Sequence, residues 1–267
     1  MNEQKQKYAG YLETAIKAAR AAGAIQKERF GSSLEISHKG EADLVTEVDL
    51  ACEETIRKIL NGTYPDHAVL GEEKGVSGAG EYRWVVDPLD GTTNFAHAYP
   101  LFCASVALEE RGRVVVGAVY DPLRDELFTA TRGGGAYLNG KPIRPTSQAT
   151  LENAMIATGF PYDFERRTQK ALRYFTTMVH HVQAIRRDGS AALNLCYVAC
   201  GRFDGFWEIS LHEWDVAAGW LIIEEAGGKI TGLDGAPTTM VSEEMIASNG
   251  PLHDRLVKIL ASVEDHL

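Results

Sequence analysis

The sequence has no long run of apolar residues, which excludes an ordinary membrane-spanning helix. No stretch approaches the roughly 18 apolar residues that such a helix needs. The first seven residues are polar, and the apolar residues between Tyr8 and Ala19 recur at helical spacing rather than forming the apolar core of a signal peptide. We therefore expect a cytoplasmic protein without a membrane-bound part.

Cysteine is also scarce, and basic residues are outnumbered by acidic ones. Cys52, Cys103, Cys196 and Cys200 lack the spacing of a disulfide framework, so we expect buried, reduced thiols. The net charge of -10 argues against general nucleic-acid binding, which requires a basic surface. An acidic protein could still bind an anionic phosphate if its carboxylates gathered divalent metal ions at one place.

The chain has no low-complexity linker and no internal repeat. Its hydrophobic share of 45% and charged share of 24% are typical of a globular protein, so the whole chain is expected to fold. A length of 267 residues fits one large domain, and we expect a single domain over residues 1–267.

Hydrophobic periodicity predicts helices towards both ends of the chain and closely spaced strands in the middle. Strands without intervening helices indicate an antiparallel meander, with a hairpin turn at residues 110–112. Helix layers interleaved with sheets fit this order better than a doubly wound parallel fold. The expected helices span residues 8–30, 45–60, 165–181, 191–199, 216–226 and 252–263. The expected strands span residues 34–37, 68–70, 82–86, 102–108, 113–120, 126–131, 205–209, 229–231 and 245–247.

Residues 84–95, WVVDPLDGTTNF, form the strongest local signal. An apolar strand ends in Asp87, turns through a proline, presents Asp90 three positions later and continues through Gly91 and Thr92 into a short helix. Two carboxylates on such a turn can hold one or two hard divalent cations, and the amides of Gly91 and Thr92 would face an anion. The alternative is purely structural: Asp90 caps the helix, and the following residues serve the turn.

Three other segments place acidic residues at the ends of elements. Glu72 follows the strand at 68–70, Asp215 stands at the start of an apolar helix, and Thr46 with Asp49 forms a capping-box pattern. Each has an ordinary explanation by itself, as a solvated loop or as a helix cap.

In combination, these segments resemble the inositol monophosphatase family, within the larger group of lithium-sensitive, Mg²⁺-dependent phosphatases. They occur in the family's order and at its approximate spacing between about residues 40 and 230. The matching segments are residues 43–46 (DLVT) with Asp49, 71–73 (GEE), 87–95 (DPLDGTTNF), 189–192 (GSAA) and 214–219 (WDVAAG).

The resemblance implies an α+β protein with a layered α-β-α-β-α sandwich of the inositol monophosphatase and fructose-1,6-bisphosphatase type, commonly a homodimer. It implies hydrolysis of a small phosphate monoester by water activated at a site of two or three Mg²⁺ ions, with myo-inositol monophosphate as the leading substrate. Relatives with the same motifs act on fructose 1,6-bisphosphate, histidinol phosphate, NADP or 3'-phosphoadenosine compounds. A regulatory interaction protein that keeps the phosphatase fold is the alternative of another class.

The resemblance also assigns roles to residues. The implied Mg²⁺ ligands are Glu72, Asp87, Asp90, Asp215 and the backbone carbonyl of Leu89. The residues implied to orient and activate the attacking water are Glu72, Thr92 and Asp49. The residues implied to contact substrate are Asp90, Gly91, Thr92, Gly189, Ser190, Ala191, Glu208 and Asp215.

A covalent route through Asp87 is the competing chemistry, because phosphatases that form an aspartyl-phosphate carry two aspartates two positions apart. Here Asp87 and Asp90 are three positions apart, which favours ligands over a nucleophile. Arg186 and Arg187 precede the Gly189 segment; they either lend positive potential to the substrate, form a subunit contact or are solvated. Glu208 equally fits the exposed surface of an edge strand.

Overall fold

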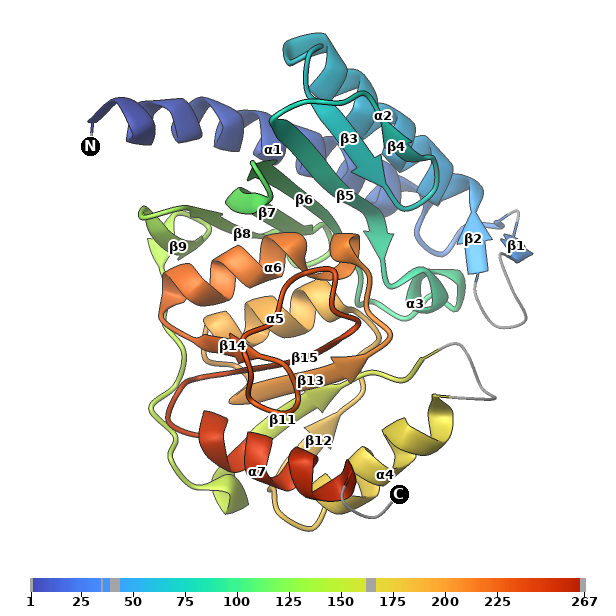
Figure 1. Cartoon of the computed structure of the whole chain (residues 1–267). Coiled ribbons are helices and arrows are strands. Elements are labelled where there is room, and N and C mark those ends of the chain that lie inside the picture. The colour runs from blue at the N-terminus through green and yellow to red at the C-terminus, as the bar shows by residue number, and fades with distance from the viewer. Residues whose placement is uncertain (1, 35, 39–43, 162–166, 265–267) are drawn as a thin grey trace.

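A computed structural model describes residues 2–34, 36–38, 44–161 and 167–264. Two sheets and three helical layers alternate across the molecule (Figure 1). Helices α1 and α2 cover the outer face of an eight-stranded sheet, α5 and α6 lie between the two sheets, and α4 and α7 cover a five-stranded sheet. This arrangement confirms the predicted α-β-α-β-α order. The bounds are α1 Asn2–Arg29, α2 Glu47–Thr63, α4 Thr168–Met178, α5 Ala191–Ala199, α6 Glu213–Ala226 and α7 His253–Glu264.

The eight-stranded sheet has the order β10-β9-β8-β7-β6-β5-β3-β4 and contains one parallel pair, β3 with β5. The predicted meander is confirmed, because β5 to β9 pair antiparallel in sequence order. The predicted hairpin turn is confirmed by the pairing of Glu110 with Arg113 across Arg111 and Gly112. The strands are β3 Ala68–Gly71, β4 Gly75–Ser77, β5 Tyr82–Asp90, β6 Cys103–Glu110, β7 Arg113–Asp121, β8 Glu126–Thr131, β9 Gly135–Leu138 and β10 Lys141–Pro142.

The five-stranded sheet has the order β12-β11-β13-β15-β14, with β11 parallel to both of its neighbours. Its central strand, β13, carries Glu208, so the reading of Glu208 as edge-strand surface was wrong. The strands are β11 Met155–Thr158, β12 Ala184–Arg186, β13 Gly205–Ile209, β14 Lys229–Thr231 and β15 Glu244–Ser248.

Several predicted bounds were wrong for identifiable reasons. The strand expected at 82–86 continues to Asp90, because the chain re-joins β6 after an irregularity in register. The helix expected from residue 216 begins at Glu213, since Asp215 lies in its first turn rather than before it. The helix expected at 165–181 is described only from Thr168 and ends at Met178; residues 165 and 166 lie outside the described part.

The amino-terminal bounds also needed correction. The helix expected at 45–60 starts after Thr46, whose hydroxyl accepts the Val48 amide as an N-cap. In place of a strand at 34–37, the short strand β1 (Ile36–His38) pairs antiparallel with β2 (Leu44–Thr46), and residue 35 lies outside the described part.

The middle helices form the core that joins the two sheets. Every residue of α5 is buried, as expected for a helix that is covered on all sides. All four cysteines are free thiols; Cys52, Cys103 and Cys196 are buried as predicted, whereas Cys200 is only partly buried. Within the described residues, we find no helix with the length and apolar character to traverse a bilayer.

Candidate active site

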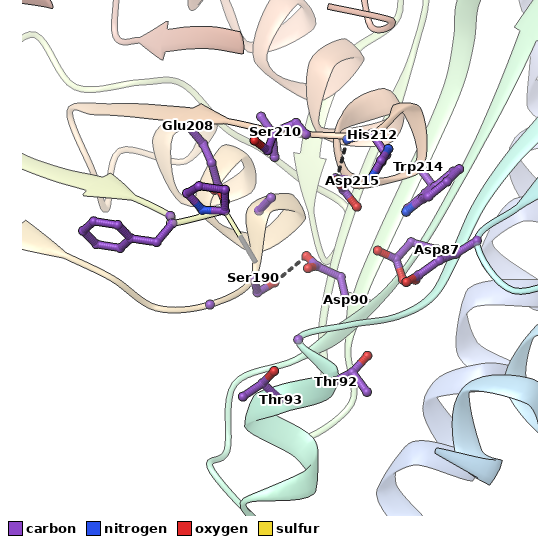
Figure 2. Close-up of a pocket in the computed structure, with 18 of the residues that line it drawn as sticks. Asp87, Asp90, Thr92, Thr93, Ser190, Glu208, Ser210, His212, Trp214 and Asp215 are labelled. Carbon is purple, nitrogen blue, oxygen red and sulfur yellow. Dashed lines mark hydrogen bonds between the residues drawn. The ribbon is translucent and has the colours of Figure 1, made fainter. Parts of the chain in front are cut away.

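A cavity of about 210 Å³ opens where the end of β5 meets the starts of α5 and α6 and the end of β13 (Figure 2). Its walls therefore come from both sheets and from the helical layer between them. All of the predicted ligand and substrate-contact residues line it, namely Glu72, Asp87, Leu89, Asp90, Gly91, Thr92, Gly189, Ser190, Ala191, Glu208 and Asp215.

The turn at the end of β5 directs two carboxylates into this cavity. Asp87 pairs with Ser105 and Asp90 with Cys103. The two aspartates are three residues apart on β5, whereas their partners are two residues apart on β6, so β5 has one extra residue here. The proline after Asp87 cannot donate to the sheet ladder, which explains an interruption at this point. The Asp87 carboxylate accepts the amide of Leu89 at 3.0 Å and is buried.

Asp90 is bound to the start of α5, a hundred residues later in the chain. Its Oδ2 accepts the hydroxyl of Ser190 at 2.6 Å and the amide of Ala192 at 2.8 Å. The one-turn helix α3 (Thr92–Ala96) that follows Asp90 has Gly91 as its N-cap and no side-chain cap. The interpretation of Asp90 as a cap of the helix that follows it was therefore wrong. Asp90 binds the start of α5 instead.

Asp49 and Thr92 come from different helices and meet at the edge of the cavity. Thr92 Oγ1 donates to Asp49 Oδ1 at 2.8 Å, and Asp49 Oδ2 accepts both the amide and the hydroxyl of Thr46. Asp49 is fully buried. Burial raises the pKa of Asp49, while the hydrogen bonds from Thr46 and Thr92 lower it. Thr92 is among the cavity-lining residues and Asp49 stands behind it.

Glu72 and Asp215 reach the cavity from two further elements. Glu72 directly follows β3, and its amide donates to the carbonyl of Val86 in β5 at 3.3 Å. Asp215 lies in the first turn of α6 and accepts the amide of His212 at 2.7 Å (Figure 2). Glu72 lies in a turn after a strand and Asp215 in the first turn of a helix, so both carboxylates stand at the end of an element and face the cavity.

The electrostatics of the cavity favour a bound cation. Burial raises the pKa of Asp87 and Asp215 well above the usual range, and the charges of neighbouring carboxylates, including Glu72 and Asp90, raise them further. Among the described residues, Arg187 is the one lysine or arginine that lines the cavity. Carboxylate and carbonyl oxygens without enough positive partners suit hard divalent ions such as Mg²⁺.

These donors surround the cavity rather than forming a closed cage. In the described part of the chain, no three His, Cys, Asp or Glu side chains lie close enough together to enclose an ion by themselves. The donor chemistry therefore fits Mg²⁺, which commonly keeps several waters and shares its coordination with substrate phosphate.

Glu208 lines the side of the cavity opposite the β5 turn. Its carboxylate lies directly against Gly159, where a Cβ atom would be 1.9 Å from Oε1. Burial raises the pKa of Glu208 to about 8, and the positive charge of Arg187 opposes this shift. Of the two arginines before the Gly189 segment, Arg187 lines the cavity and Arg186 is exposed.

Sequence reasoning gave no role to Asn94, although it lies within the DPLDGTTNF segment. Its Nδ2 donates to the carbonyl of Asp188 at 2.7 Å and to that of Leu101 at 2.8 Å, so it ties α3 to the Gly189 segment. Phe160, Ser210, His212 and Trp214 also line the cavity without having been predicted as site residues. Only Trp214 had a signal, because it belongs to the WDVAAG segment.

Comparison with known proteins agrees with this geometry. A sequence model of the inositol monophosphatase family matches residues 8–265. The chain is 43% identical to an inositol-1-monophosphatase of Synechocystis sp., over 94% of this chain and 89% of that protein. It is 42% identical to the Nus factor SuhB of Pseudomonas aeruginosa, over 96% of each chain.

The chain belongs to the inositol monophosphatase family. Its structure is similar to that of the extragenic suppressor protein SuhB from Bartonella henselae, with a TM-score of 0.90 and 40% identity over 94% of this chain and 98% of that one. Membership makes the chain a phosphomonoesterase of this family. The relatives divide between proteins named for inositol monophosphate hydrolysis and proteins named as Nus factors, so the particular ester is a separate question.

Proposed function

We propose that this protein is a Mg²⁺-dependent phosphatase that hydrolyses myo-inositol monophosphate to inositol and phosphate. The observation that carries the proposal is the arrangement of Glu72, Asp87, Asp90 and Asp215, from the end of β3, from β5 and from α6, around one cavity with the Asp49–Thr92 pair at its edge. Two or three Mg²⁺ ions, when bound, would lower the pKa of water and neutralise charge on the phosphate.

In this proposal, the four carboxylates and the carbonyl of Leu89 hold the ions. Glu72 orients the attacking water and accepts its proton. The Thr92 hydroxyl has Asp49 Oδ1 at 2.8 Å and the Leu89 carbonyl at 3.0 Å as acceptors for its hydrogen. With the hydrogen donated to Asp49, the Thr92 lone pairs are available to accept a hydrogen bond from the same water. The oxygen of this water forms the new bond to phosphorus, and the bond from phosphorus to the inositol oxygen breaks. That oxygen takes up a proton from solvent water, and Glu72 releases the proton it accepted to solvent, so the site returns to its starting state.

The substrate would lie along the length of the cavity. The backbone amides of Gly91 and Thr92 would donate to phosphate oxygens, and Arg187 adds positive potential. Gly189, Ser190, Ala191 and Glu208 would contact the inositol ring, although the Ser190 hydroxyl is already donated to Asp90. The preference for inositol over fructose 1,6-bisphosphate, histidinol phosphate, NADP or 3'-phosphoadenosine compounds rests on Glu208, which faces the cavity and can bind a ring hydroxyl.

A second role as a regulatory partner of transcription proteins is motivated by the relatives named as Nus factors. This chain keeps all four carboxylates, so we propose regulation as an addition to catalysis and not as its replacement. We further propose a homodimer in the cytoplasm, with inhibition by lithium as in the larger phosphatase group.

A phosphate-release assay tests the proposal. The purified protein is incubated with inositol monophosphates, fructose 1,6-bisphosphate, histidinol phosphate, NADP and 3'-phosphoadenosine compounds. Chelation of divalent ions is expected to abolish release, and Mg²⁺ is expected to restore it. Release from every ester without divalent ions would contradict the metal mechanism; a clear preference for another ester would contradict the inositol assignment alone.

A further inference from the structure

A buried ion pair on α2 lies beneath the turn that carries Glu72. Glu53 and Arg57 are four residues apart, with Arg57 Nε donating to Glu53 Oε1 at 2.7 Å. The Glu53 side chain is fully buried and that of Arg57 is 10% exposed. Neither residue lines the cavity, and neither belongs to the segments that resemble the family.

The Glu53 carboxylate holds the backbone on the carboxyl side of Glu72. Its Oε2 accepts the amide of Glu73 at 2.7 Å, and its Oε1 accepts the amide of Lys74 at 3.0 Å. Hydrogen bonds from amides to an ionised carboxylate are stronger than those between neutral groups. The two residues that follow Glu72 are therefore held at a defined distance from α2.

The same carboxylate also contacts the residue on the amino side of Glu72. A Cβ atom at Gly71 would lie 2.6 Å from Glu53 Cδ, closer than such atoms approach one another. Gly71 thus leaves the space that the carboxylate occupies. Glu53 consequently touches the chain on both sides of Glu72.

Arg57 extends this support to the far strand of the hairpin. It donates to Ser77 Oγ at 2.7 Å, to the carbonyl of Gly75 at 2.5 Å and to that of Val69 at 3.4 Å. One guanidinium therefore joins Glu53, β3 and β4. The β3–β4 hairpin, whose turn contains Glu72, is therefore tied to α2 through this pair, in addition to the pairing of β3 with β5.

We propose that Glu53 and Arg57 are positioning residues for Glu72, which hold its carboxylate at the place where it binds Mg²⁺ and orients water. This role rests on the proposed function, because it acts through Glu72. An error of about 1 Å in the position of a catalytic group can cost on the order of 100-fold in rate, so a rigid support for a turn residue has a direct effect on turnover.

The principal test compares Glu53→Gln in two backgrounds, the natural sequence and Glu72→Gln. In the natural background, Glu53→Gln is expected to lower kcat by roughly ten-fold or more and to weaken Mg²⁺ binding, while KM for the ester changes less than about two-fold. Mg²⁺ binding is measured by isothermal titration calorimetry, which does not depend on activity. In the Glu72→Gln background, the same substitution is expected to change Mg²⁺ affinity less than about two-fold.

A second pair of variants keeps both charges in place. Gly71→Ala would displace the Glu53 carboxylate and is expected to reproduce the loss of Mg²⁺ affinity. Gly62→Ala, on the helix α2 that also carries Glu53, is the matched control. Nothing lies within 4 Å of its added methyl group, so no change in Mg²⁺ affinity is expected. Circular dichroism and thermal melting report whether each variant is folded. If Glu53→Gln does not fold, Gly71→Ala decides the matter.

Two results would overturn the proposal. One is an equal loss of Mg²⁺ affinity from Glu53→Gln with and without the Glu72 carboxylate, which would indicate a general structural role. The other is a folded Glu53→Gln and a folded Gly71→Ala that both keep natural Mg²⁺ affinity and turnover. A natural protein that hydrolyses no phosphate ester would contradict the proposed function instead, and the Mg²⁺ titrations would still test the positioning role.

Discussion

Thr92 donates its hydroxyl hydrogen to Asp49 across 43 residues of sequence, at a distance of 2.8 Å. If this pair orients the attacking water, Thr92→Val is expected to lower kcat by about 100-fold, in the range of general acid–base contributions. Thr92→Ser keeps the hydroxyl and is the matched control, with a loss of no more than several-fold. The measurement is the steady-state rate of phosphate release with saturating Mg²⁺. Similar rates for the valine and serine variants would exclude the hydroxyl from the mechanism.

Asp90→Asn is expected to abolish most activity and to change stability much less. The amide keeps an oxygen that can accept from Ser190 and Ala192, so the start of α5 retains its partner, but the charge that would bind Mg²⁺ is lost. Removing one of several mutually repelling carboxylates also lowers the electrostatic repulsion within the metal-free protein. Phosphate release and thermal melting without metal provide the two readouts. Ser190→Ala is the comparison, since it removes one of the two hydrogen bonds to Asp90 and leaves the charge, and a smaller loss of activity is expected.

Glu208→Ala is expected to slow hydrolysis of an inositol monophosphate more than hydrolysis of an ester whose alcohol carries no further hydroxyl. A site built to bind a substrate hydroxyl discriminates against substrates that lack it. We expect kcat/KM for myo-inositol monophosphate to fall about ten-fold further than kcat/KM for a simple aryl phosphate. Gly159→Ala, which would displace the same carboxylate, is expected to act in the same direction. Equal losses on both esters would remove the basis for the inositol assignment and leave the phosphatase assignment intact.

The pH dependence of stability is expected to contain a contribution from His253, far from the cavity. This side chain is buried between Thr231 Oγ1 and Ser248 Oγ, each 2.8 Å from a ring nitrogen. Burial and, to a smaller extent, the charge of Lys229 together lower its pKa to about 4, and Asp254 opposes the shift. The unfolded chain, with an ordinary histidine pKa, therefore binds the proton more readily.

It follows that the contribution of His253 to the free energy of unfolding is fully present above about pH 6.5. This contribution is lost as the pH falls towards 4, by about 3 kcal/mol at most. The measurement is the free energy of unfolding in urea between pH 7 and pH 4, for the natural protein and for His253→Gln. The difference between the two proteins should shrink as the pH falls, which separates His253 from the other titrating groups. A difference that is constant over this range would contradict the assignment.

Elements with a local pattern could be predicted from the sequence, whereas contacts between distant segments could not. The meander has clear alternation, α5 is an apolar run of helical length, and the DPLDGTTNF segment identifies its own turn. Strands β4, β9, β10, β11 and β12 were missed; each has two to four residues, and so short a run shows little alternation.

The site was predicted in its residues but only partly in its geometry. The resemblance brought together side chains from segments far apart in the sequence; the implied metal ligands and substrate contacts line the cavity, and Asp49 stands behind Thr92. The bond between Asp90 and Ser190 spans a hundred residues and has no local signature. Glu53 and Arg57 were also missed, because a pair four residues apart on a helix is common on solvated surfaces, whereas here both side chains are buried and bind the β3–β4 hairpin.

The two hydrogen bonds that Asp90 accepts from the start of α5 make the cavity a property of both halves of the chain. The segment from Tyr82 to Ala96 contains the signature of the family, but its second aspartate is oriented by groups that the chain supplies a hundred residues later. A fragment with that segment alone would possess the acidic groups and lack their arrangement. Transplanting the signature into another sheet would fail for the same reason, because the acceptor would be moved without its donors.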